Sequence, residues 1–381
     1  MTTVAVNDTA ATATAVGEAR RLRLGFNSRI AFPAGHAAEG LRDGIELFRV
    51  AEQLGYDTGW VYQRHFDNYL ASPLVFHAAA AQHTERIGLG TAIIGARYED
   101  PVLLAEAAGT ADLLSGGRLQ LGLGTGQGGY DHIFGQEPND GRDQSQARLA
   151  TFLRGIRGEK LGEVTDPAGL VAAGTELFVR PTSPTLPDRV WYGGGSVASA
   201  ERVGRQGLRL LLSTILSGQI DDYGAELARA VEAYRVAYTG TSPSRVAIAR
   251  SVLPATSPEH ARVYAAYDEQ RRTHGPAASR PEGALTPAAA PPARFTMSPV
   301  HHGAPSAIVD QLLADPSLAV SDELIAFLPP AFGLRDNLRL LEDIAETVAP
   351  HLGWAPPPAE GDHPAARSGL RVGQQSGDLG R

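Results

Sequence analysis

Two side chains suited to proton transfer and anion binding stand together in the segment GWVYQRHFDN, where Arg64 and His65 follow an apolar stretch. A histidine exchanges protons near neutral pH, so His65 is a candidate catalytic residue. Arg64 is a candidate for binding an anionic substrate or a negatively charged cofactor. Simpler interpretations stay open, because a lone histidine more often makes a local hydrogen bond and an arginine is often only solvated.

A run of glycines supplies a second feature, an uncovered backbone. The segment DLLSGGRLQLGLGTGQGG, from Asp112 to Gly129, predicts a helix end, a glycine turn, a short strand at 119–124 and a glycine-rich exit. A glycine inside a strand usually marks close approach by a ligand or by another backbone. Glycines after a strand allow positive φ and an exposed peptide face. We therefore expect a flat or phosphorylated cofactor at the carboxyl end of this strand.

A second glycine cluster, WYGGGSVASAERVG, predicts a phosphate site. It ends a predicted strand, frees backbone amides at Gly193, Gly194 and Gly195, and starts a helix. The N–H groups and the dipole of a helix N-terminus favour an anion. The hydroxyls of Ser196 and Ser199 add donors. Ser196 also fits the simpler role of helix cap, and the two roles are compatible.

Composition limits the class of protein. Of the 381 residues, 43% are hydrophobic and 20% are charged, which is typical of a globular protein. The net charge of −8 argues against a nucleic-acid or anionic-membrane partner. The sequence contains no cysteine, which excludes disulfides, thiolate metal sites and a cysteine nucleophile. No apolar run approaches the ~20 residues of a spanning helix, and the N-terminus lacks a signal-peptide core, so a cytoplasmic location is expected.

Strand-like and helix-like segments alternate along the chain. Eight short apolar runs are each followed by a stretch with the apolar spacing of a helix. Expected strands cover residues 22–27, 58–62, 87–94, 119–124, 189–192, 208–212, 245–253 and 323–328, and the helices after them begin at Leu41, Ser72, Pro101, Gln144, Ser196, Asp221, Pro258 and Leu334.

Eight such units predict a closed (β/α)8 barrel, in which function sits at the carboxyl ends of the strands. A barrel of typically ~250 residues with insertions accommodates the chain as one domain. That domain is expected at 21–353, with insertions at about 158–188 and 274–300 and a further helix at 306–313. The tails at 1–20 and 354–381 are expected to be disordered.

A doubly wound sheet is the alternative fold, because Gly124, Gly126 and Gly129 form GxGxxG after a strand. Two features argue against it. The following segment lacks the apolar spacing of the helix that this motif opens, and three strand–helix units precede it, whereas the dinucleotide motif usually lies in the first.

Three motifs in register, AEQLGYDTGWVYQRHF, GLGTAIIGARYEDPVLLAE and SGGRLQLGLGTG, resemble the bacterial luciferase-like, flavin-dependent monooxygenase family. The resemblance runs from about Arg23 to about Leu352. It implies a barrel enzyme that takes reduced FMN from a separate flavin reductase and oxygenates a small organic substrate with O2 through a C4a-peroxyflavin. Two alternatives remain: an F420-dependent hydride-transfer oxidoreductase, and a flavin-binding protein without turnover.

The resemblance also implies where a flavin binds. It assigns the phosphate to the turn after the second glycine cluster. It assigns the isoalloxazine ring to the backbone of Thr91 and Ala92, where a non-proline cis peptide before Ile93 is allowed, and to Thr125 and Gly126. Family members carry one or two histidines after the second strand, and Arg64 stands at the first of these positions.

The same resemblance implies a homodimer through helices of the second and third units. A buried apolar pocket beside the first four strands is expected to hold the substrate, and segments 32–40, 158–188 and 274–300 to select it. Tyr130, Asp131 and His132 are further candidates for substrate contact. Surface positions are expected for the remaining histidines considered, which are His77, His83, His301 and His302, and no metal site is expected.

Overall fold

The computed structural model describes residues 21–126, 128–136, 142–166, 171–274 and 295–357. The predicted N-terminal tail, most of the C-terminal tail and most of the second predicted insertion lie outside these ranges. The predicted domain limits therefore stay predictions.

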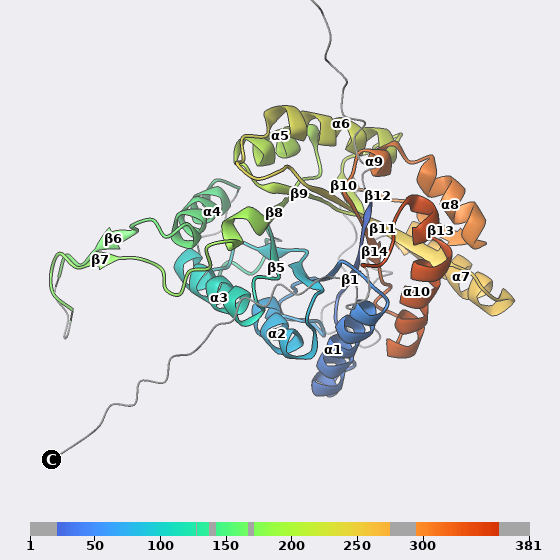
Figure 1. The fold of residues 1–381 in the computed structure, drawn as a ribbon, viewed down its shortest axis with the longest axis horizontal. Helices are drawn as coiled ribbons and strands as arrows, with labels where there is room; N and C mark the ends of the chain where they lie inside the picture. Colours follow the sequence, from blue (N-terminus) through green and yellow to red (C-terminus); the bar gives the residue numbers. More distant parts are fainter. Residues whose placement is uncertain (1–20, 127, 137–141, 167–170, 275–294, 358–381) are drawn as a thin grey trace, which may run out of the picture.

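Eight parallel strands form a closed barrel (Figure 1). Each pairs with the next, and the last pairs with the first, which confirms the (β/α)8 prediction and excludes the doubly wound sheet. The barrel strands are β1 (Arg23–Ser28), β2 (Thr58–Val61), β3 (Gly88–Thr91), β5 (Leu119–Gly124), β8 (Val190–Gly193), β9 (Arg209–Leu212), β11 (Val246–Pro254) and β14 (Glu323–Phe327).

Helices surround the barrel and cover the outer faces of its strands (Figure 1). Local sequence fixes where several begin. The Asp100 side chain accepts hydrogen bonds from two amides of the first turn of α3, and Pro101 opens that helix. The helices are α1 (Ala37–Gln53), α2 (Pro73–Ala80), α3 (Pro101–Leu114), α4 (Arg142–Ile156), α5 (Val197–Arg205), α6 (Tyr223–Ala237), α7 (Pro258–His274), α8 (Pro305–Leu313), α9 (Pro316–Ala319) and α10 (Leu334–Thr347).

Short strands lie outside the eight-stranded path. The expected third strand is divided, because β4 (Ile94–Gly95) pairs with β5 after a break at residues 92–93. In the first predicted insertion, β6 (Gly162–Glu163) and β7 (Glu176–Leu177) form a hairpin that projects from the barrel (Figure 1). Near the second, β12 (Phe295–Met297) pairs with β10 (Ile215–Ser217), and β13 (Val300–Gly303) pairs with β11.

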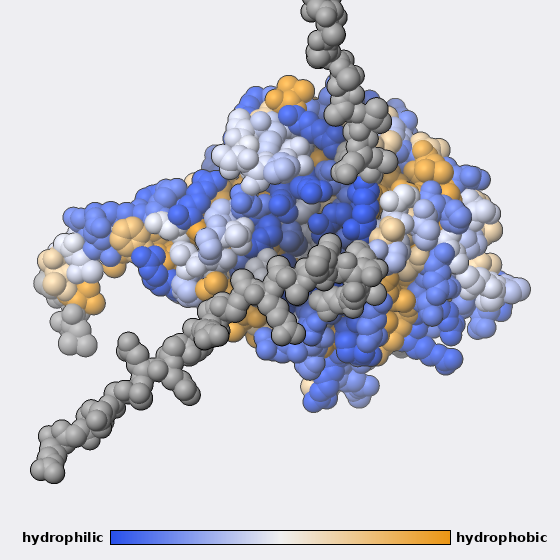
Figure 2. All heavy atoms as spheres, in the orientation of Figure 1, coloured by the Kyte–Doolittle hydropathy of each residue, from blue (hydrophilic) through white to orange (hydrophobic). Residues whose placement is uncertain are grey.

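The barrel interior is packed with side chains. Trp60 and Trp191 meet edge to face, with ring centroids 5.4 Å apart, and Leu211, Ala247 and Ile325 complete this cluster. A separate, larger apolar cluster fills the space between strands and helices. Figure 2 shows a hollow on the barrel axis with mostly hydrophilic residues around it. Among the described residues, no helix is both long and apolar enough to cross a membrane.

Candidate active site

The two glycine-rich backbone surfaces lie side by side at one end of the barrel. Strands β5 and β8 are neighbours, and Leu123 is paired with Tyr192. The exits that follow, at Thr125–Gly126 and at Gly194–Ser196, therefore leave the sheet next to each other. Since all eight strands are parallel, Arg64, His65, Thr91 and Ala92 belong to the same end of the barrel.

Glycine in β5 admits the end of the neighbouring strand. A Cβ atom at Gly122 would lie 1.9 Å from the carbonyl oxygen of Thr91, and one at Gly124 would lie 2.6 Å from Ile93 Cδ1. The close approach expected from the sequence is thus made by the segment 91–93. The peptide bond between Ala92 and Ile93 is cis, as the family resemblance allowed.

The Thr91 side chain forms hydrogen bonds with the backbone of the neighbouring strand β5. Its Oγ1 donates to the Gly122 carbonyl oxygen at 2.8 Å and accepts from the Gly122 amide at 2.9 Å. The residue is fully buried, and its hydroxyl is used within the sheet. The backbone role expected of Thr91 stays a prediction.

The exit from β5 is held open by glycine. Gly126 has φ of +88°, and a Cβ atom added there would lie 3.0 Å from the Gly95 Cα. The Thr125 hydroxyl lies 3.3 Å from the Tyr192 hydroxyl, which also accepts from Gln146 Nε2 at 2.9 Å. These contacts join the end of β5 to β8 and α4.

The N-terminus of α5 presents unpaired donors. Ser196 and Ser199 form a reciprocal capping box, with Ser196 N to Ser199 Oγ at 2.9 Å and Ser199 N to Ser196 Oγ at 3.3 Å. Within the described ranges, the amides of Gly195, Val197 and Ala198 have no hydrogen-bond acceptor. Gly195 and Ser196 are exposed, while Gly194 is buried and donates to the Leu211 carbonyl oxygen. Both roles considered for Ser196 are therefore compatible with this geometry.

His65 lies half-buried among aromatic rings. Its ring centroid is 5.2 Å from that of Phe134 and 6.2 Å from that of Tyr98. Burial lowers the pKa of His65, and the negative charge of Glu99 opposes that shift only in part. The imidazole is consequently neutral at pH 7 and has one ring nitrogen able to accept a proton.

Arg64 is paired within its own loop. Its Nε donates to Asp67 Oδ2 at 3.2 Å, and the guanidinium lies 5.9 Å from the Tyr69 ring centroid. The Asp67 side chain is completely buried. This arrangement differs from a simply solvated arginine, and it ties Arg64 to the loop that carries His65.

The ion pair between Arg97 and Asp131 at this end of the barrel was not predicted from the sequence. Arg97 Nε donates to Asp131 Oδ1 at 2.7 Å, and its guanidinium borders Gly128. Burial would raise the pKa of Asp131, but hydrogen bonds from Arg97 and the Gly129 amide outweigh it and lower that pKa. Asp131 is therefore engaged by protein, while Tyr130 packs its ring against Phe66. The available signal was an arginine directly after the GLGTAIIGA motif.

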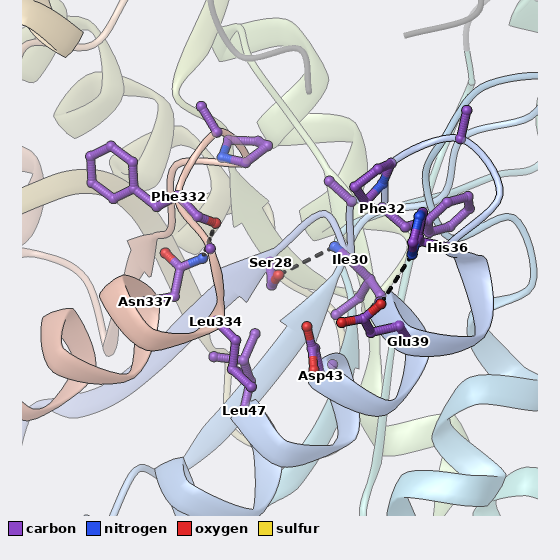
Figure 3. A pocket seen from close by; sticks show the side chains of 18 residues that line it. Ser28, Ile30, Phe32, His36, Glu39, Asp43, Leu47, Phe332, Leu334 and Asn337 are labelled. Carbon is purple, nitrogen blue, oxygen red and sulfur yellow. Dashed lines mark hydrogen bonds and ion pairs between the residues drawn. The ribbon is translucent and has the colours of Figure 1, made fainter. Parts of the chain in front are cut away.

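A cavity of about 700 Å³ opens at the ends of β1 and β14, between the start of α1 and the loop before α10 (Figure 3). Apolar side chains of Ile30, Phe32 and Leu334 line it together with carboxylates. Burial and repulsion from Glu39 raise the pKa of Asp43. The expected pocket was apolar and lay beside the first four strands. This cavity is lined mostly by apolar residues, including most of segment 32–40, but of those four strands it adjoins only β1.

Two of the histidines predicted to be at the surface are buried, which corrects that prediction. His77 is 1% exposed, and its Nε2 donates to the Gly90 carbonyl oxygen at 2.8 Å. His301 is buried and contacts Gln311 Oε1 through Nδ1 at 3.0 Å. His83 is exposed as predicted, and His302 lies 3.4 Å from Asp268. Among the residues described, no group of three potential metal ligands is present.

The comparisons with known proteins agree on one family. The profile of the luciferase-like monooxygenase family matches residues 22–319. A 4-hydroxyprotoasukamycin monooxygenase from Streptomyces nodosus subsp. asukaensis is 36% identical over 143 residues, which is 36% of this chain and 38% of that protein. A limonene 1,2-monooxygenase from Rhodococcus erythropolis is 31% identical over 181 residues, covering 43% and 46%. The chain thus spans less than half the length of these two relatives.

Solved structures share the fold. The oxygenating constituent of 3,6-diketocamphane monooxygenase from Pseudomonas putida, solved with FMN, superposes with a TM-score of 0.62 and 19% identity, covering 87% of this chain and 98% of that one. Relatives named F420-dependent glucose-6-phosphate dehydrogenases also match, at 28% and 29% identity over 55% of their own length.

Proposed function

The chain belongs to the luciferase-like monooxygenase family, and on that basis we propose that it is an FMN-dependent monooxygenase that uses reduced FMN and O2 to oxygenate a small organic substrate. The observation that carries the proposal is the adjacency of two uncovered backbone surfaces, at the ends of β5 and β8, beside the residue 91–93 segment. A flat ring with a phosphorylated side chain matches that combination.

The N-terminus of α5 would hold the phosphate. The amides of Gly195, Val197 and Ala198 offer hydrogen bonds that no described residue takes up. Ser196 contributes its hydroxyl, since the Ser199 hydroxyl already donates to the Ser196 carbonyl oxygen at 2.8 Å. The dipole of α5 adds to the attraction for an anion.

The ring would lie against peptide groups of Thr91–Ala92 and Thr125–Gly126. These four residues have small side chains or none, Arg97 borders Gly126, and Ile93 fills the space above Gly124. When bound, reduced FMN supplies the electrons that activate O2. His65, neutral at pH 7, would accept a proton from the reacting centre on its free ring nitrogen, while Phe134 and Tyr98 exclude water around it. The anion-binding role expected of Arg64 stays a proposal, and its pairing with Asp67 holds the guanidinium in the loop that carries His65.

F420-dependent hydride transfer is the second candidate. It is favoured by the relatives named as F420-dependent dehydrogenases, which align with nearly half of this chain. The backbone surfaces described above accommodate either ring. A flavin-binding protein without turnover is the third candidate, and it predicts tight flavin binding with no reaction.

Three further expectations belong to the proposal. Reduced FMN would come from a separate flavin reductase. A homodimer is supported by exposed apolar side chains on α2 and α3, namely Val75, Leu103, Leu113 and Leu114. A cytoplasmic location stays a prediction, supported by the negative net charge and the lack of cysteine.

Oxygen labelling tests the proposal directly. The protein is loaded with photoreduced FMN under argon and mixed with ¹⁸O2 and a panel of small organic compounds. We expect ¹⁸O in at least one product, with no requirement for NADH or a reductase protein. Reduction of a panel compound by reduced F420 under argon, without ¹⁸O incorporation in the FMN reaction, would instead establish hydride transfer.

A further inference from the structure

Side chains from β1, β14 and β11 form the last interior layer at the carboxyl end of the barrel. Asn27 and Phe327 are register partners on β1 and β14. Phe327 follows Ile325 on the face that points into the barrel. Ser251 follows Ala249 on the same face of β11, one step beyond the last paired residues of β11 and β14. Asn27, Phe327 and Ser251 are therefore neighbours in one layer, and all three are buried.

A buried arginine covers this layer. Arg271, on α7, is 3% exposed, and its guanidinium carbon lies 5.6 Å from the Phe327 ring centroid. Its Nη1 contacts the Tyr267 hydroxyl at 3.5 Å. Its Nε and Nη2 have no hydrogen-bond partner. Within the described chain Arg271 has no carboxylate partner, because Asp268, one turn earlier, pairs with Arg272.

The layer beneath Arg271 contains further unsatisfied atoms. Asn27 Oδ1 and Ser251 Oγ are both buried without a hydrogen-bond partner. Buried polar groups in folded proteins are nearly always paired, so a cluster of exceptions needs an explanation, and a bound polar group supplies one. Rotation of the Asn27 amide by about 180° puts its N–H groups where the unpaired oxygen now lies. Arg271, Asn27 and Ser251 thus all have buried polar atoms without partners in or over this one layer.

The shape of the free donors indicates which acceptor. Nε–H and Nη2–H lie along one edge of the planar guanidinium, and that edge matches the two oxygens of a carboxylate. Arg29, whose guanidinium carbon lies 5.5 Å from the same Phe327 ring, adds positive potential. The Phe327 ring supplies an apolar surface for the rest of the molecule. An organic acid with a small apolar body satisfies all of these features.

We propose that Arg271, with Ser251 and Asn27, binds the carboxylate of a small organic acid, and that this acid is the substrate class of the enzyme. Carboxylate binding by Arg271 is independent of the proposed function. The assignment of the acid as substrate rests on the proposed function, and it is supported by the position of the site at the same end of the barrel as the β5 and β8 backbone surfaces.

Calorimetric titration of the full chain tests the site. The probes are acetate, isovalerate and benzoate, each compared with its uncharged amide at constant ionic strength. We expect at least one carboxylate to bind about 10-fold more tightly than its amide. Arg271→Gln should remove that difference, and Arg271→Lys should restore only part of it, since lysine keeps the charge but lacks the fork.

Arg272→Gln is the matched control, because Arg272 is the next residue, is largely exposed and pairs with Asp268 and Glu269. It should leave carboxylate affinity unchanged. If Arg271→Gln fails to fold by circular dichroism, Ser251→Ala and Asn27→Ala are titrated instead, and each should weaken binding by about 10-fold. Equal binding of acid and amide, or wild-type affinity in the variants that fold, overturns the site.

Two further titrations, with inorganic phosphate and with FMN, test which ligand the site binds and whether the site belongs to the enzyme's reaction. Inorganic phosphate that binds more tightly than every carboxylate, and in an Arg271-dependent way, overturns the carboxylate assignment. FMN titration of the same samples separates this site from the proposed function. Carboxylate binding that depends on Arg271 in a protein that fails to bind FMN upholds the site and contradicts the enzymatic role.

Discussion

His65 is the residue on which the proton-transfer chemistry depends. We predict that His65→Asn lowers turnover by about 100-fold, a typical loss for a general base, and leaves FMN affinity unchanged. Because burial lowers the pKa of His65, the neutral form persists below pH 6.5, and activity falls only as pH drops through that lowered pKa. Steady-state rates from pH 5 to 8 check both points. Exposed His83→Asn is the control, and an unchanged acidic limb in His65→Asn excludes the role.

His77 makes a separate prediction about stability. Burial lowers its pKa from 6.5 to about 4, although the Gly90 carbonyl favours the protonated form. The unfolded chain takes up a proton below pH 6.5 while the folded protein does not, so stability falls as pH decreases from 6.5 to 4. The loss is at most about 3 kcal/mol. Urea unfolding should show a shallower pH dependence in His77→Gln than in the wild type or His83→Gln, and equal slopes would refute it.

At the scale of single residues the sequence shows residue type and spacing but not whether a side chain is buried. His65 and the glycine clusters stand out by type and spacing. His77 did not, because α2 is apolar at most positions and gives no clear inner face. Arg271 could not be predicted as a binding residue from the sequence. Its position matters only because the folded chain places it on α7 against Phe327, which belongs to the distant strand β14. A buried hydrogen-bond donor that lacks an acceptor cannot be predicted from the residues next to it in the sequence.

At the scale of elements, β5 depends on glycine for its fit to the end of β3. Gly122→Ala would place a Cβ atom 1.9 Å from the Thr91 carbonyl oxygen, and backbone must move to relieve that contact. We predict a loss of about 3 kcal/mol or more in the free energy of unfolding. Gly162→Ala is the control, because a Cβ there meets nothing within 4 Å. Equal urea midpoints for the two variants would contradict this packing.

Strand and helix limits followed closely from the sequence. Expected and observed strands coincide within one or two residues at β1, β2, β5 and β14, because apolar runs bounded by glycine or charge define them. The break between β3 and β4 did not follow from periodicity, since the apolar run continues unbroken through Ala92, Ile93 and Ile94. Only the family resemblance suggested a special backbone there.

At the scale of the whole molecule, the exposed apolar surface of α2 and α3 predicts self-association. Val75 is 73% exposed and Leu103 is 65% exposed. We predict that the double variant Val75→Glu, Leu103→Glu converts a dimer to a monomer, because charge is disfavoured at the centre of an interface. Light scattering after size exclusion measures the mass. Val236→Glu, at an 84% exposed position on α6, should leave it unchanged, and a wild-type monomer would refute the proposal.

The barrel itself was predictable because eight repeats of strand and helix permit few other closed arrangements. The shape of the candidate binding sites was not predictable. The cavity beside α1 and the Arg271 layer both form where segments distant in sequence come into contact. Local sequence patterns do not predict contacts of this kind.

The central claim is that the N-terminus of α5, next to the β5 exit, binds the phosphate of the cofactor. Anaerobic fluorescence titration with reduced FMN and reduced riboflavin tests it most directly, since the two ligands differ only in the phosphate. We predict that the wild type binds FMN at least about 10-fold more tightly, and that the Ser196→Ala, Ser199→Ala variant binds the two nearly equally. Asp222→Ala, which removes the cap of α6, should keep the wild-type preference. Equal affinity of the wild type for both ligands, or an undiminished preference in the double variant, would contradict the account.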